Sequence, residues 1–100
     1  MENYAEVGVP EFTRLMKDFL QGRLDAGQYA QQYFALMKKR MTLTEEESRV
    51  LQRAYGDADD YEPDASIELP NLLSEHQLRE RVAQSLRELA ELGHGVEFGT

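Results

Sequence analysis

The sequence predicts an all-α fold, an antiparallel four-helix bundle with a long acidic loop between the third and fourth helices. Three observations lead to this prediction. Apolar residues recur every three or four positions in four segments, helix-capping residues precede three of these segments, and no segment alternates between apolar and polar residues as a strand does. The 100 residues predict one domain over 1–100, with flexible segments at 1–8 and 94–100.

The first helix is expected from Pro10 to about Gln21. Proline suits the first turn of a helix, because its missing N–H would have no partner there. Gly22 follows the segment, and glycine commonly ends a helix in the left-handed conformation. One apolar stripe at helical spacing is formed by Phe12, Leu15, Met16, Phe19 and Leu20.

The second helix is expected to begin after Asp25, whose side chain can cap it. Lys38, Lys39 and Arg40 follow its last apolar residue, where positive charge opposes the negative end of the helix dipole. Its apolar stripe consists of Ala26, Tyr29, Ala30, Tyr33, Phe34 and Met37. We interpret Tyr29, Tyr33 and Tyr55 as core or core-edge residues whose hydroxyl groups reach solvent.

The third helix is expected to begin at a capping box formed by Thr44 and Glu47. Its apolar stripe consists of Val50, Leu51, Ala54 and Tyr55. Gly56 is expected to end this helix, although one further turn is compatible with the sequence.

A second capping box, formed by Ser74 and Gln77, predicts the start of the fourth helix. This helix should extend to about Leu92, and Gly93 should stop it. Its buried face is predicted to consist of Leu78, Val82, Leu86 and Leu89. The first two connections between helices are short, which favours antiparallel neighbours. The third, 57–73, is long enough to predict a functional or disordered segment.

The formal net charge of −8 disfavours nucleic acids and anionic membranes as ligands and favours a basic protein partner. The chain has no cysteine, which excludes disulfides and thiolate chemistry. No segment approaches the roughly 18 apolar residues that a membrane span needs, and the N-terminus lacks the pattern of a secretory signal. We therefore expect a soluble, cytoplasmic protein.

The negative charge is concentrated in one part of the chain. Residues 41–75 contain ten acidic and two basic side chains, a net charge of −8, whereas residues 1–40 carry +1 and residues 76–100 carry −1. Tyr61 lies inside the acidic run, and aromatic residues often anchor interfaces. An ordinary solvated loop remains the alternative interpretation. The candidate partner-binding residues are Asp57, Asp59, Asp60, Tyr61, Glu62, Asp64 and Glu68.

The same acidic segment can be compared with the pattern of a calcium-binding loop. Asp57, Asp59 and Glu68 match positions 1, 3 and 12 of an EF-hand loop, but Tyr61 stands where a third oxygen ligand is needed and Glu62 where the glycine is needed. The two histidines, at 76 and 94, have no neighbouring ligand at metal-binding spacing. The chain also lacks a phosphate-binding glycine loop and a nucleophile-elbow serine. We predict no metal, no cofactor and no enzymatic activity.

Three segments resemble the colicin D immunity protein family, within the colicin-like and contact-dependent growth inhibition immunity proteins. Residues 19–26, Phe-Leu-Gln-Gly-Arg-Leu-Asp-Ala, are similar to the turn between the family's first two helices. Residues 58–65, Ala-Asp-Asp-Tyr-Glu-Pro-Asp-Ala, show the family's acidic residue, aromatic residue and Glu-Pro-Asp-Ala. Residues 78–82, Leu-Arg-Glu-Arg-Val, together with Leu86, are similar to its last helix. The resemblance covers about residues 12 to 90.

The resemblance implies a four-helix bundle that binds and occludes the active site of a cognate ribonuclease toxin that cuts tRNA. The partner would be the basic C-terminal nuclease domain of that toxin, held in a heterodimer. Asp59, Glu62 and Asp64 match the family's contact positions, and the other candidates are added as their neighbours. A nuclease active site must hold phosphates, so carboxylates could take their places. The alternative is a helical adaptor or regulatory subunit that binds a protein through an apolar groove.

Overall fold

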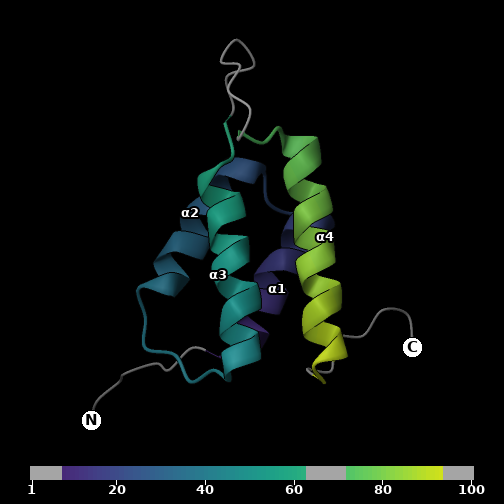
Figure 1. Ribbon diagram of the computed structural model, residues 1–100. Coiled ribbons are helices and arrows are strands. Elements are labelled where there is room, and N and C mark those ends of the chain that lie inside the picture. Colours follow the sequence, from purple (N-terminus) through teal and green to yellow (C-terminus); the bar gives the residue numbers. More distant parts are fainter. Residues whose placement is uncertain (1–7, 63–71, 94–100) are drawn as a thin grey trace.

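The computed structural model describes residues 8–62 and 72–93, and within these ranges it contains four helices and no β-strand. The helices are α1 (Val9–Leu20), α2 (Ala26–Met37), α3 (Glu45–Asp59) and α4 (Glu75–Glu91). Both α1 and α3 pack against α2 and α4, so the helices form a four-sided bundle (Figure 1). The all-helical prediction is confirmed for this part of the chain. The antiparallel order and the long acidic loop stay predictions, and most of that loop lies outside the described residues.

All three predicted capping residues begin their helices. Asp25, Thr44 and Ser74 each accept a hydrogen bond from the backbone N–H three residues later, at 2.8, 3.1 and 3.2 Å. The side chains of Gln28, Glu47 and Gln77 accept hydrogen bonds in return from the backbone of the capping residues. Local sequence therefore determines where α2, α3 and α4 begin.

The third helix does not end at Gly56 but continues to Asp59. Gly56 is not in the left-handed conformation, which Gly22 and Gly93 do adopt, with φ angles of 83° and 90°. Ala58 continues the buried face of α3 and is 3% exposed. The packing of Ala58 stabilises this extra turn, so the helix continues through Gly56, although glycine often ends helices.

An aromatic cluster from α1 and α2 lies at the centre of the core. Phe19 stacks on Tyr29 with ring centroids 4.6 Å apart, and Phe12 lies 5.1 Å from Tyr33. The expectation that the tyrosine hydroxyls reach solvent is wrong for Tyr29 and Tyr33, which are fully buried. The Tyr33 hydroxyl instead donates a 2.7 Å hydrogen bond to the carbonyl of Leu51, which connects α2 to α3. No helix in the described residues is long and apolar enough to cross a membrane.

Gly56→Ala should raise the free energy of unfolding by about 0.5–1 kcal/mol, since alanine favours a helix more than glycine does. A Cβ atom at this position would meet no atom within 4 Å. The matched control is Gly22→Ala, which should lower the free energy of unfolding by about 1–2 kcal/mol because of its positive φ angle. Urea denaturation measures both changes. A destabilised Gly56→Ala protein would contradict a helix that continues to Asp59.

Candidate functional site

The end of the bundle where α3 finishes and α4 starts is closed by two backbone hydrogen bonds. The Leu73 N–H donates to the Asp60 carbonyl at 2.8 Å, and the Glu62 N–H donates to the Leu73 carbonyl at 3.0 Å. Tyr61 and Leu73 thereby form an isolated parallel bridge. Leu73 is buried, and Tyr61 packs against the core from a partly buried position. The two sides of the connection are therefore held together where they leave the helices.

Tyr61 lies among carboxylates from three different elements. Burial raises the pKa of its hydroxyl, and the negative charges of Glu75, Asp25 and Glu62 raise this pKa further. Asp25 precedes α2, and Glu75 is the first residue of α4. Figure 1 shows the turn before α2 at the same end of the bundle as the connection from α3 to α4. We call this surface the acidic end, and it consists of Asp25, Asp59, Asp60, Tyr61, Glu62 and Glu75.

The sequence-predicted residues divide into three groups. Asp59 is exposed at the end of α3, and Asp60, Tyr61 and Glu62 follow it at the acidic end. Asp64 and Glu68 lie outside the described residues. Asp57 lies inside α3 and is buried. Sequence reasoning did not group Asp25 or Glu75 with this site, because only the folded bundle brings the beginnings of α2 and α4 close to Tyr61.

Asp57 supports the acidic end from inside the bundle. Its Oδ1 atom accepts a 3.0 Å hydrogen bond from Arg81 on α4, and its Oδ2 atom is buried without a hydrogen-bond partner. Burial raises the pKa of Asp57, and the positive charges of Arg81 and Arg53 oppose that rise. The pair joins α3 to α4 one helical turn before Tyr61. The carboxylate of this ion pair is buried, whereas the Arg81 side chain is half-exposed, so the pair fixes geometry more than it adds stability.

Arg79 has a corresponding role on the other side of α4. Its guanidinium lies over the Phe19 ring, 4.3 Å from the centroid, and donates a 2.6 Å hydrogen bond to the Phe19 carbonyl. It also forms an ion pair with Glu75 at 3.0 Å. Arg79 therefore joins α4 to the end of α1 and holds one of the carboxylates near Tyr61.

The helix dipole affects the acidic residues at the two ends of α3 differently. Glu45, Glu46 and Glu47 occupy the first turn, where the helix dipole stabilises negative charge. Asp59 and Asp60 lie at the opposite end, where the dipole repels negative charge, and the last turn has no basic residue. Asp59 and Asp60 therefore lower the stability of α3, unlike Asp25 and Glu75, which lie at the beginnings of α2 and α4. Helix stability does not explain the presence of Asp59 and Asp60.

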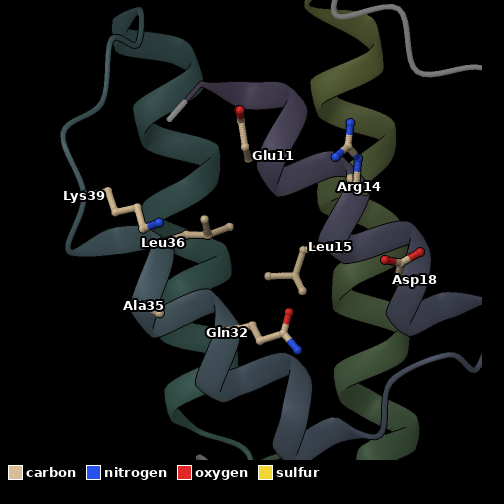
Figure 2. Close-up of a pocket in the computed structure, with 8 residues that line it drawn as sticks. All are labelled: Glu11, Arg14, Leu15, Asp18, Gln32, Ala35, Leu36 and Lys39. Carbon is tan, nitrogen blue, oxygen red and sulfur yellow. The ribbon is translucent and has the colours of Figure 1, made fainter. Parts of the chain in front are cut away.

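A second candidate surface is a groove between α1 and α2 (Figure 2). Its volume is about 290 Å³. Leu15 and Leu36 point into it from opposite helices in Figure 2. Its other lining residues are Glu11, Arg14, Asp18, Gln32, Ala35 and Lys39. The charged residues on its rim are of both signs, since Glu11 and Asp18 are negative and Arg14 and Lys39 are positive.

The described residues include no group of three or more histidine, cysteine or acidic side chains arranged to hold a metal ion. His76 lies at the start of α4, and its Nε2 atom is 3.3 Å from a carboxylate oxygen of Glu80, one turn further along the helix. The acidic end and the groove both offer contacts for a protein partner.

The fold and the acidic end together define a small, acidic helical-bundle protein. The sequence model of one family, described as bacterial self-protective colicin-like immunity, matches residues 7–89. The chain therefore belongs to the family of bacterial colicin-like immunity proteins. Membership implies that it binds and inhibits a cognate toxin rather than catalysing a reaction. No significant match is found among curated proteins or among solved structures. The resemblance to this family is confirmed, and the colicin D subgroup stays a prediction.

Replacing Asp57 with asparagine tests the burial of this carboxylate. Its pKa in the folded protein lies above the ordinary value of 3.8, so the folded state holds the proton more tightly. The resulting stabilisation is present below the ordinary pKa and is lost as the pH rises through the raised pKa. The free energy of unfolding of the wild type, minus that of Asp57→Asn, should therefore fall as the pH rises from the ordinary pKa of 3.8 through the raised pKa. Urea titrations at several pH values measure this difference, and a constant or rising difference would refute the assignment.

Proposed function

We propose that the protein inhibits a nuclease toxin, with tRNA as the toxin's substrate, by inserting its acidic end into the toxin's active site. The observation that carries this proposal is the position of Tyr61, which the bridge to Leu73 holds at the end of the bundle where Asp59, Asp60 and Glu62 also lie. A nuclease must bind phosphates, so its active site presents cationic side chains. The carboxylates would occupy the phosphate positions and exclude the substrate.

The distribution of charge supports the same partner. The net charge of −8 belongs to residues 41–75, and Asp59 and Asp60 lie where the dipole of α3 disfavours them. A basic nuclease domain at the C-terminus of the toxin would relieve this repulsion on binding. Asp64 and Glu68 are proposed as further contacts from the sequence, whereas Asp57 is proposed to act through the positions of its neighbours. The inhibitor would act in the cytoplasm, where the toxin meets RNA.

We also propose that the bundle is antiparallel and that 1–100 forms one domain. Contacts between α3 and α4 support the first point. Arg53 pairs with Glu88 and Asp57 pairs with Arg81, while Tyr61 bridges Leu73. Positions further along α3 therefore meet positions earlier in α4. The connection between these helices would be the long acidic loop that the sequence predicts.

Removing three charges from the acidic end should weaken binding of the cognate toxin domain. The variant is Asp59→Asn, Asp60→Asn and Glu62→Gln, which keeps the size of each side chain. Each desolvated charge pair that is broken costs about 2–5 kcal/mol, so the dissociation constant should rise by at least 100-fold. Isothermal titration calorimetry with a catalytically inactive toxin domain measures this change, and survival of toxin-expressing cells reports inhibition.

A matched control removes three charges from the opposite end of the bundle, where Figure 1 shows the start of α3 and the end of α4. The control variant is Glu45→Gln, Glu46→Gln and Glu91→Gln, three residues that are exposed. It changes the net charge by the same amount and should change the dissociation constant by less than about threefold. Equal effects of the two variants would show that net charge, rather than the acidic end, governs binding.

The association rate should also depend on salt. Attraction between opposite charges speeds encounter by roughly 10–1000-fold at low ionic strength, and salt screens this attraction. Stopped-flow measurements between about 20 mM and 500 mM NaCl should therefore show a steep fall for the wild type and a shallower fall for the acidic-end variant. An association rate independent of salt would rule out electrostatic steering.

A helical adaptor is the second candidate, and the groove between α1 and α2 favours it. A partner in this groove would contact Leu15 and Leu36 and would bind with little dependence on salt. Unlike a nuclease toxin, such a partner would not need to be a basic protein. The Ala35→Arg variant, which places a long charged side chain in the groove, separates the two candidates. It should weaken an adaptor's partner and leave inhibition of the toxin unchanged.

A further inference from the structure

One aromatic side chain on α3 is exposed without an evident role in the core. Among the described residues, the exposed large hydrophobic side chains are Tyr55, which is 41% exposed, and Leu92, which is 40% exposed. Tyr55 contrasts with Tyr29 and Tyr33, which are fully buried. Leu51, Ala54 and Ala58 already form the buried face of this part of α3. Core packing therefore does not require an aromatic ring at position 55.

The Tyr55 ring is held in place despite its exposure. It meets the Phe34 ring of α2 edge-on, with centroids 5.4 Å apart and an angle of 74° between the ring planes. Phe34 is itself half-buried and packs against the core. An exposed ring supported in this way loses little conformational entropy when a partner docks. We call Tyr55 and Phe34 the aromatic pair.

The aromatic pair adjoins the acidic end. Asp59 follows Tyr55 by four residues on α3, so the two side chains are neighbours on one face of the helix. Both are exposed. One turn further from the acidic end, the exposed neighbours are Gln52 on α3 and Lys38 at the end of α2, because α2 begins at the acidic end. An exposed aromatic centre that is bordered by polar side chains and adjoins carboxylates is typical of a binding hot spot.

We propose that the aromatic pair is the apolar anchor of the toxin interface and that it takes an arginine side chain of the toxin. A guanidinium group can lie over the Tyr55 ring and at the same time donate hydrogen bonds to the Asp59 carboxylate. The two contacts suit one arginine, since its planar group offers both a flat face and donors at its edge. This inference rests on the proposed function for the identity of the partner.

The two parts of the interface then have separate roles. Carboxylates at the acidic end attract the toxin from a distance and mainly set the association rate. A desolvated ring contact acts only after docking and mainly sets the dissociation rate. This separation makes the contribution of Tyr55 measurable independently of the charge of the protein, because substitutions at position 55 leave the net charge unchanged.

The test compares three substitutions at position 55 by surface plasmon resonance with a catalytically inactive toxin domain. Tyr55→Ala should raise the dissociation rate by about 10–100-fold and change the association rate by less than about twofold. Tyr55→Phe keeps the aromatic face and should stay within about threefold of the wild type. Tyr55→Leu keeps apolar contact with Phe34 but lacks the aromatic face, so its dissociation rate should rise. If Tyr55→Ala does not fold, the dissociation rate of Tyr55→Leu tests the anchor in its place.

Leu92→Ala is the matched control, since Leu92 is as exposed as Tyr55 but follows the end of α4. It should bind as the wild type does. Wild-type dissociation rates for both Tyr55→Ala and Tyr55→Leu would overturn the anchor while leaving the acidic-end proposal intact. Conversely, a large effect at position 55 combined with wild-type binding of the acidic-end variant would reject phosphate mimicry and would also overturn the arginine contact, which requires the Asp59 carboxylate.

Discussion

The ion pair between Asp57 and Arg81 is the constraint on which the acidic end depends. It crosses from α3 to α4 at 3.0 Å, with the carboxylate almost fully buried. Burying a charge is costly unless a partner compensates it. The Asp57 carboxylate therefore holds the last turn of α3 against the part of α4 that carries Arg81. Tyr61 follows one turn later and can form its bridge to Leu73 only when the two helices keep this spacing. The surface that we assign to toxin binding is therefore positioned by an interaction that faces the interior.

The carboxylates of α3 show how one helix combines stability with binding. Its first turn uses three glutamates that the dipole stabilises, and one of them, Glu47, completes the capping box. Its last turn and C-cap carry Asp59 and Asp60 against the dipole. A sequence selected only for stability would place basic residues there. The acidic residues that cost stability are those at the end of the bundle that the family resemblance associates with the toxin, which is the expected compromise at a functional surface.

Sequence alone predicted the elements whose causes are local. The capping residues Asp25, Thr44 and Ser74 satisfy N–H groups within their own first turns, so their effect does not depend on the rest of the fold. Gly56 was misleading because its role depends on Ala58, which packs against other helices. The buried hydroxyl of Tyr33 finds its acceptor 18 residues away, at Leu51, and no local pattern indicates such a partner. The acidic run was visible in the sequence, whereas the proximity of Asp25 and Glu75 to Tyr61 follows from the packing of the bundle.

Repulsion in the unbound protein contributes to the affinity that we propose. Carboxylates held near one another by the Tyr61–Leu73 bridge cannot separate, so their mutual repulsion persists while the bundle is folded. A basic partner removes that repulsion and adds its own attraction, so the free inhibitor begins closer in energy to the bound state than a relaxed loop would. Selectivity has the same origin. Nucleic acids and anionic surfaces would add to the repulsion, and only a cationic cavity that also accommodates the ring of Tyr55 offers both electrostatic relief and apolar contact.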